Sequence, residues 1–97
     1  MNNKPPNQTR PEYIIQGDLR ITERADRTLE IADVWHALRR HSKGDWGDLH
    51  DLCELANAEA FDHGLDLLSL YHDRHGILFT VVTSADRSTT TVSLLFE

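Results

Sequence analysis

The stretch LDLLSLYHDRHGILFTVVTSADRSTTTVSLLF, residues 65–96, decides the fold class. Within it lie three runs rich in apolar and β-branched residues, at 65–72, 77–84 and 89–96. Two short polar connectors separate these runs, at 73–76 and 86–88. Strands joined by such short turns pair antiparallel with their neighbours. The stretch therefore predicts a three-stranded antiparallel β-meander.

Residues 28–42, upstream of the meander, have the periodicity of an amphipathic helix. Apolar residues recur there at the spacing of one helix face: Ile31, Val34, Trp35 and Leu38. Basic residues fill the last turn, where they complement the helix dipole, and Gly44 follows as a C-terminal cap. We therefore expect a helix over 28–42 with Trp35 in the core.

A second helix is predicted over residues 48–63, with Asp48 as its N-cap and Gly64 after its end. Its apolar arc comprises Leu49, Leu52, Cys53, Ala56 and Ala60. The acids of this segment fall mostly on the opposite side. A short link at 44–47 joins the two helices, which favours a helical hairpin or corner.

A three-stranded sheet needs a cover for its apolar face, and the two helices supply one. The sequence thus predicts an α+β fold in which two helices pack on a three-stranded antiparallel β-meander. Residues 19–22 alternate in polarity and are predicted as a short extra strand at the N-terminal side. The polar, proline-containing residues 1–11 predict a disordered tail, and residues 12–97 a single domain.

Length and charge exclude several classes of protein. The chain has 97 residues and a formal net charge of −6. The acidic balance argues against direct binding to nucleic acid, which requires clustered Lys and Arg. Apolar runs are too short for a membrane helix, and the N-terminus has no secretory signal. The single cysteine, Cys53, cannot form an internal disulfide, so we expect a reducing, cytoplasmic setting.

The acids cluster between residues 44 and 73, where eight Asp and Glu occur without any Lys or Arg. Acids three residues apart on a helix lie about 5–6 Å from each other, comparable to phosphates along a nucleic-acid strand. The predicted partner-binding residues are Asp45, Trp46, Asp48, Asp51, Glu54, Glu59 and Asp62. Trp46 is the expected interface anchor, because tryptophan is enriched at binding hot spots. The alternatives are helix caps and a core tryptophan at Gly44–Asp48, and a solvated helix face that aids solubility.

No catalytic or metal-binding signature accompanies these acids. Six histidines are present, and His50 and Cys53 lie one helical turn apart, but a closed zinc site needs about four ligands. The Thr-rich run after Asp86 has no His–Asp arrangement beside it and suits a strand. We therefore predict a protein that is not an enzyme and that carries no metal and no cofactor.

Four segments resemble a family of small bacterial proteins: RHSKGDWGDL at 40–49, ANAEA at 56–60, GLDLLSLY at 64–71 and TSADRSTTTV at 83–92. The likeness covers about residues 29–96, and the segments stand in the family's order. The resemblance implies carriage on plasmids and other mobile elements, where members are often labelled as restriction–modification components. This chain is too short for a methyltransferase domain and lacks a glycine-rich cofactor loop after a strand.

Two functions from different classes are consistent with these observations. In the first, the protein binds a host defence complex, such as a CRISPR effector or a restriction enzyme, and occupies its basic nucleic-acid-binding surface. In the second, it is a homo-oligomeric accessory or regulatory protein of plasmid maintenance, joined through the sheet edge or the Trp46 loop.

Overall fold

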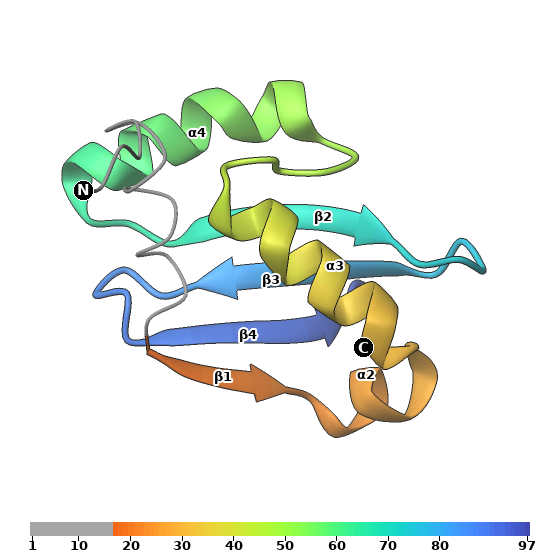
Figure 1. Cartoon of the computed structure of the whole chain (residues 1–97). Coiled ribbons are helices and arrows are strands. Elements are labelled where there is room, and N and C mark those ends of the chain that lie inside the picture. Colours follow the sequence, from red (N-terminus) through yellow and green to blue (C-terminus); the bar gives the residue numbers. More distant parts are fainter. Residues whose placement is uncertain (1–16) are drawn as a thin grey trace, which may run out of the picture.

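A mixed sheet of four strands forms the framework of the described part of the chain (Figure 1). The computed structural model describes residues 17–97, so the predicted tail over 1–11 and the predicted domain start at 12–16 lie outside the described residues. The strands are β1 (Asp18–Ile21), β2 (Leu67–His72), β3 (Leu78–Thr83) and β4 (Thr89–Leu94). They lie side by side in the order β1-β4-β3-β2.

The meander is confirmed, because β2 pairs with β3 and β3 with β4 in antiparallel register. The extra N-terminal strand is also present, and β1 pairs in parallel with β4, from Asp18 opposite Thr89 to Ile21 opposite Val92. The prediction of a three-stranded, wholly antiparallel sheet is thus corrected to four strands of mixed direction. A parallel neighbour needs a long crossover. The helices and the β2–β3 hairpin between β1 and β4 provide it.

Within residues 17–97 three helices precede the meander: α2 (Glu23–Thr28), α3 (Ile31–Ser42) and α4 (His50–His63). The last two match the predicted helices, with starts two or three residues later. The N-cap of α4 is Leu49, however, and not the predicted Asp48. Helix α2 was not predicted, because six residues are too few to display helical periodicity. It begins where the Thr22 hydroxyl accepts a hydrogen bond from the Ala25 N–H at 3.2 Å, the usual role of a threonine N-cap. None of these helices is long and apolar enough to cross a bilayer.

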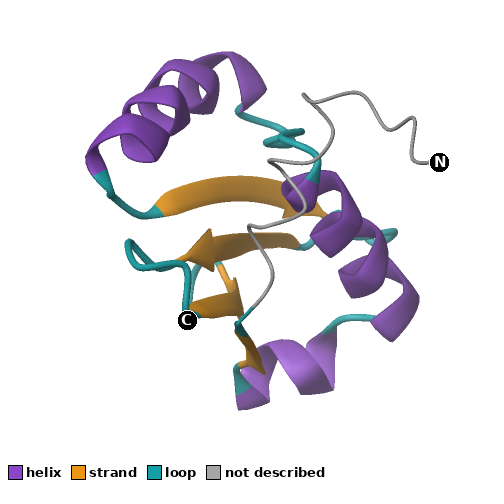
Figure 2. Ribbon diagram, turned by 60° about the vertical axis from the view of Figure 1, so that its left-hand side comes forward, coloured by secondary structure: helices purple, strands orange, loops and turns teal. Residues whose placement is uncertain are grey.

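Helix α3 crosses one face of the sheet, and α4 lies beside the edge strand β2 (Figures 1 and 2). The larger core cluster lies between the sheet and helices α2 and α3, and comprises Ala25, Leu29, Val34, Ala37, Leu38, Tyr71, Phe79, Val81 and Val92. A smaller cluster fills the space under α4 and comprises Trp46, Cys53, Ala60 and Leu67.

Two expectations about buried helix faces are corrected. In α3 the buried stripe is Val34, Ala37, Leu38 and His41, whereas Trp35 is 55% exposed. The predicted stripe was displaced because His41 was counted as polar. In α4 the buried residues are Cys53, Asn57 and Ala60, whereas Leu49 and Leu52 are exposed. The reason is Asn57, which faces the sheet because its amide bonds Leu68 of β2. The buried face of α4 is therefore centred nearer to Asn57 than to the predicted apolar arc.

The outer edge of β2 is covered by α4 and by the loop before it, both of which form hydrogen bonds with the strand. The Asn57 amide accepts from the Leu68 N–H at 3.1 Å and donates to the Leu68 carbonyl at 2.8 Å. Two residues along, the Leu70 N–H donates to the Trp46 carbonyl and the Leu70 carbonyl accepts from the Asp48 N–H. These bonds satisfy edge groups that would otherwise be free to pair with another chain.

Gly47 makes the close approach of this loop to β2 feasible. Its φ is +82°, a left-handed conformation that glycine adopts without strain. A Cβ at this position would collide with the Leu70 carbonyl oxygen and with the Tyr71 ring. The second glycine of the GDWGD segment therefore has a steric role in the fold.

Candidate functional site

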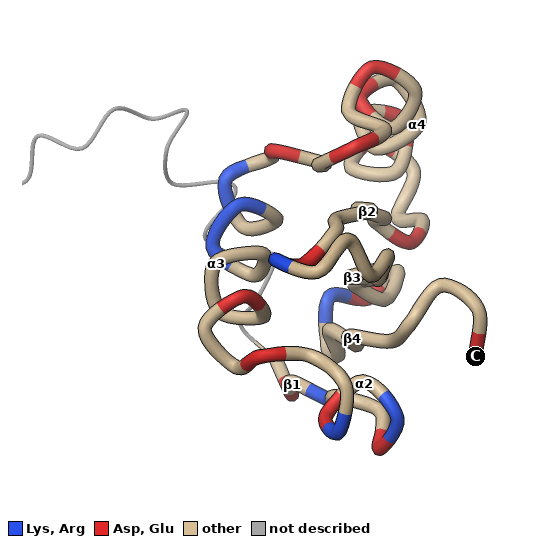
Figure 3. The backbone as a smooth tube through the Cα atoms, turned by 90° about the vertical axis from the view of Figure 1, so that its right-hand side faces the viewer, with Lys and Arg blue, Asp and Glu red and all other residues tan. Residues whose placement is uncertain are grey.

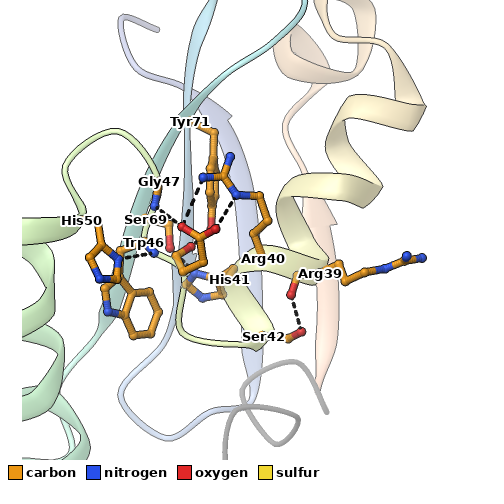
Figure 4. A network of polar contacts seen from close by, with 10 residues as sticks. Arg39, Arg40, His41, Ser42, Trp46, Gly47, His50, Ser69 and Tyr71 are labelled. Atoms are coloured by element: carbon orange, nitrogen blue, oxygen red, sulfur yellow. Dashed lines mark hydrogen bonds and ion pairs between the residues drawn. The ribbon is translucent and has the colours of Figure 1, made fainter. Parts of the chain in front are cut away.

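The end of α3 and the GDWGD segment form a compact polar network over β2 (Figure 4). The Arg40 guanidinium donates to both carboxylate oxygens of Asp45, at 2.7 and 3.1 Å. Asp45 also accepts from the Gly47 N–H, and the Tyr71 hydroxyl donates to the Asp45 carbonyl at 2.6 Å. The hydrogen bonds from Arg40 lower the pKa of the Asp45 carboxyl below its usual value. Asp45 is thus engaged within the fold, so it is a weaker candidate for partner contact than a free surface acid.

Trp46 lies in the core rather than on the surface, which corrects its assignment as an interface anchor. Its side chain is 4% exposed and packs in the cluster under α4. The His41 ring meets it edge-to-face, with ring centroids 5.5 Å apart. In the sequence, Trp46 lies between Gly44 and Gly47, which suggested a recognition loop. In the structure, its neighbours Asp45 and Gly47 both contact β2, which places the tryptophan side chain inside the fold.

His41 is the centre of a second, fully buried polar network. It is 0% exposed, and its two ring nitrogens lie 2.5 Å from the Ser69 hydroxyl and 2.9 Å from the Thr83 hydroxyl. The Thr83 hydroxyl is in turn 2.8 Å from that of Thr90. Burial lowers the pKa of His41 to about 4, so the ring is neutral at pH 7. The Ser69–His41 pair resembles a nucleophile and its base, but no substrate reaches a side chain with no exposed surface.

The ADRS segment locks the β3–β4 turn onto the end of α4. Asp86 accepts from the Ser88 hydroxyl and N–H and from the Ser84 hydroxyl, and these hydrogen bonds together lower the pKa of Asp86 to about 2. Arg87 adopts a positive φ of 65° and donates to the carbonyls of Ala60 and Leu65. Arg87 thereby satisfies carbonyl groups at the C-terminus of α4.

The segments that carry the family resemblance therefore build the fold. Arg40, Asp45, Gly47, Asn57 and Arg87 each hold one element against another. Comparisons with family models, with curated proteins and with solved structures found no match to this chain. A functional surface is therefore expected among side chains outside these networks.

The outer face of α4 is the clearest such surface. Four predicted binding residues on it are exposed: Asp51, Glu54, Glu59 and Asp62. Leu52 and Leu55 lie among them and are 73% and 74% exposed. We call these six residues the acidic–leucine face. Figure 3 shows acidic segments along α4 and no basic ones.

Sequence reasoning missed the two leucines of this face, although a signal was present. Acid–leucine pairs recur every three residues at Asp48-Leu49, Asp51-Leu52 and Glu54-Leu55. Only one side of a helix can face a small core, so a helix with leucines on several sides must expose some of them. Leu49, at 40% exposed, continues the stripe toward the GDWGD segment.

The histidines beside these acids form pairs rather than a metal site. His72 Nδ1 lies 2.8 Å from Asp48 Oδ2, His63 Nε2 lies 3.3 Å from Glu59 Oε2, and His50 lies near Glu54. Cys53 is buried, and burial raises the pKa of its thiol. Across residues 17–97 no three His, Cys, Asp or Glu side chains are grouped to hold a metal ion.

Proposed function

We propose that the protein is a non-enzymatic binding protein whose acidic–leucine face docks on a basic surface of a protein partner. The observation that carries the proposal is the exposure of Leu52 and Leu55 among four exposed acids on one helix. Isolated exposed leucines are common on protein surfaces. Two strongly exposed leucines on adjacent turns, framed by charge, are typical of an interface core with a polar rim.

The two kinds of side chain contribute differently to binding. Removing a leucine side chain from water contributes about 1.5–3 kcal/mol when burial is complete, so the leucines supply affinity. The acids supply orientation and a fast, salt-sensitive encounter with a positively charged partner. A basic partner surface is required because an acidic or neutral one would leave these carboxylates desolvated and unpaired.

The partner class that best fits this chemistry is a nucleic-acid-binding defence complex, such as a CRISPR effector or a restriction enzyme. Its nucleic-acid groove is lined by Lys and Arg spaced to meet phosphates. The acids of α4 recur at a similar spacing, so the helix is suited to occupy such a groove in place of DNA. The family resemblance, with its link to mobile elements, supports the same class.

The test is competition with DNA for a panel of purified CRISPR effector complexes and restriction enzymes, followed by fluorescence anisotropy of labelled target DNA. We expect the protein to displace DNA from at least one of them, more weakly at higher salt. The variant with Asp51→Lys, Glu54→Lys and Asp62→Lys should lose this competition. A matched variant with Asp18→Lys, Asp26→Lys and Glu30→Lys, which makes the same charge change away from α4, should keep it. Undiminished competition by the α4 variant, or no competition with any complex, would overturn the proposal.

A homo-oligomer joined through the same face is the less favourable reading. Two copies packed through α4 would bring eight carboxylates together, four from each helix, and like charges across an interface oppose association. Sedimentation at increasing protein concentration distinguishes the homo-oligomer from the protein that binds a partner. Self-association that strengthens with salt and is lost in the variant with Leu52→Ala and Leu55→Ala would favour the homo-oligomer.

A further inference from the structure

The helices of the described chain pack on one face of the sheet and leave the other face uncovered. Side chains of a strand point alternately to the two faces. The strand residues of the larger core cluster, Tyr71, Phe79, Val81 and Val92, all lie on the face toward α2 and α3. Neither buried cluster of residues 17–97 includes a strand side chain from the opposite face. Figure 3 shows α3 on one side of the strands and the C-terminal segment after β4 on the other.

The uncovered side has a row of cross-strand neighbours at its centre. Leu68 of β2 is opposite Val82 of β3, which is opposite Thr91 of β4. The Leu68 side chain is 40% exposed, and Val82 and Thr91 are half-buried. We call this surface the open sheet face, and its residues in the meander are Leu68, Leu70, Leu78, Thr80, Val82, Thr91 and Ser93.

The open sheet face is depleted of charge. The strands β2, β3 and β4 contain no Asp, Glu, Lys or Arg, although these residues make up 27% of the chain. The edge strand β1 adds Asp18 and Arg20, whose charges cancel. The solvated face of an antiparallel sheet is usually polar, whereas the core of a protein–protein interface is depleted of charged residues. The open sheet face therefore has the composition of an interface core.

The segment after β4 adds apolar surface beside this face. The Leu95 N–H donates to the Leu78 carbonyl at 3.1 Å, so the segment starts next to the open sheet face. Leu95 is 38% exposed and Phe96 is 85% exposed. The Glu97 carboxylate accepts from the Thr22 hydroxyl at 2.9 Å, which ties the end of the segment to the sheet. In Figure 3 this segment projects on the side of the strands away from α3.

We propose that a second copy of this chain docks on the open sheet face. The two sheets pack face to face in a symmetric dimer, and Phe96 of each copy covers the margin of the other sheet. Such a contact uses the same patch on both copies. Two chains of net charge −6 repel each other, and the repulsion is smallest where the contact surface itself has no net charge. Helix α4 stays outside the contact, so this inference does not depend on the acidic–leucine face.

The size of the open sheet face predicts a dimer that dissociates on dilution. Four strands spaced about 4.8 Å apart and about 20 Å long give a footprint of about 400 Å² per copy. The two footprints, with two Phe96 rings that bury about 150–250 Å² each, remove about 1,200 Å² from water. That area is at the lower end of the range for specific interfaces, where transient complexes lie. We therefore expect a Kd between about 10 μM and 1 mM.

Sedimentation velocity of the full chain, from about 5 μM to 1 mM, tests the proposal over this range of Kd. We expect the weight-average mass to rise from that of the monomer toward that of the dimer. The rise should be steeper at higher salt, because salt screens the repulsion between the two acidic chains. A mass that stays at the monomer value would overturn the proposal. Growth beyond the dimer would also overturn it, because a symmetric face-to-face contact closes after two copies.

Two lysine variants locate the contact. Val82→Lys places a charge at the centre of the open sheet face, and we expect at least a tenfold weaker self-association. Leu55→Lys makes the same charge change at a 74% exposed position of α4 and should leave the dimer unchanged. Circular dichroism checks that both variants are folded. Loss of the dimer in Leu55→Lys but not in Val82→Lys would assign the contact to α4 and overturn the proposal.

Methyl chemical shifts give a second measurement that needs no variant, so the proposal stays testable if Val82→Lys does not fold. The methyl shifts of Leu68 and Val82 should change with protein concentration along the same curve as the mass, while those of Leu52 and Leu55 stay constant. Phe96→Ser, which alters an exposed residue outside the strands, should weaken the dimer about tenfold or more. Concentration-dependent shifts confined to the α4 methyl groups, or an unchanged Kd in Phe96→Ser, would contradict this arrangement of the dimer.

Discussion

His41 shows how one residue couples the fold to pH. Its ring is fully buried between Ser69 and Thr83, and burial holds its pKa at about 4, below the 6.5 of an exposed histidine. Protonation is thus easier in the unfolded chain than in the folded protein. The neutral His41 ring therefore contributes fully to stability above pH 6.5, and this contribution is lost as the pH falls from 6.5 through about 4.

We predict that the free energy of unfolding decreases by up to about 3 kcal/mol between pH 7 and pH 4 through His41 alone. Carboxylates whose pKa is lowered in the folded protein also contribute less to its stability in acid, but this loss occurs mainly below pH 4. Urea unfolding at pH 7, 6, 5 and 4 should therefore give a steeper loss for the natural chain than for His41→Gln, whose amide has no charge to acquire. Parallel pH profiles for the two proteins would show that His41 does not titrate in this way.

At the scale of elements, Asn57 joins α4 to the sheet edge through both groups of its amide. We predict that Asn57→Ala lowers the free energy of unfolding by about 2–3 kcal/mol, because the Leu68 N–H and carbonyl lose buried partners. The variant should also aggregate more readily, since its β2 edge is less protected. Ala58→Gly, at an exposed position of the same helix, serves as the control and should cost about 1 kcal/mol, from helix propensity alone. Thermal unfolding with light scattering measures both effects.

The same elements show what the sequence could and could not predict. The meander and the two longer helices were predictable, since periodicities of 2 and 3.6 residues are local properties of the chain. The rotation of α4 was not, because it depends on a polar residue, Asn57, that is buried for its hydrogen bonds to β2. The exposure of Trp35 and the burial of Trp46 have the same origin: which face is covered depends on contacts between segments far apart in the sequence. The exposed acids of α4 were identified because charge excludes a side chain from the core wherever the helix lies.

At the scale of the whole molecule, the two edges of the sheet differ in protection. The β2 edge is covered by α4 and the Trp46 loop, whereas β1 has four residues and pairs with β4 alone among the described strands. Strand β3 lies between two partners at the centre. Stability is distributed unevenly in proteins, and segments with few buried contacts open first.

This asymmetry predicts the order of amide hydrogen exchange. The amides of β3 should exchange only through global unfolding, and the Leu68 and Leu70 amides of the sealed edge should be nearly as protected. The Asp18 and Thr22 amides, which bond the carbonyls of Ser88 and Val92 from the β1 side, should exchange through a separate local opening at lower free energy. Native-state exchange by NMR at increasing urea distinguishes the two processes, since local opening is insensitive to denaturant. Asn57→Ala should speed the hydrogen exchange of the Leu68 amide and leave the exchange rate of the Asp18 amide unchanged. Equal protection of both edges would mean that β1 is held by contacts beyond its pairing with β4.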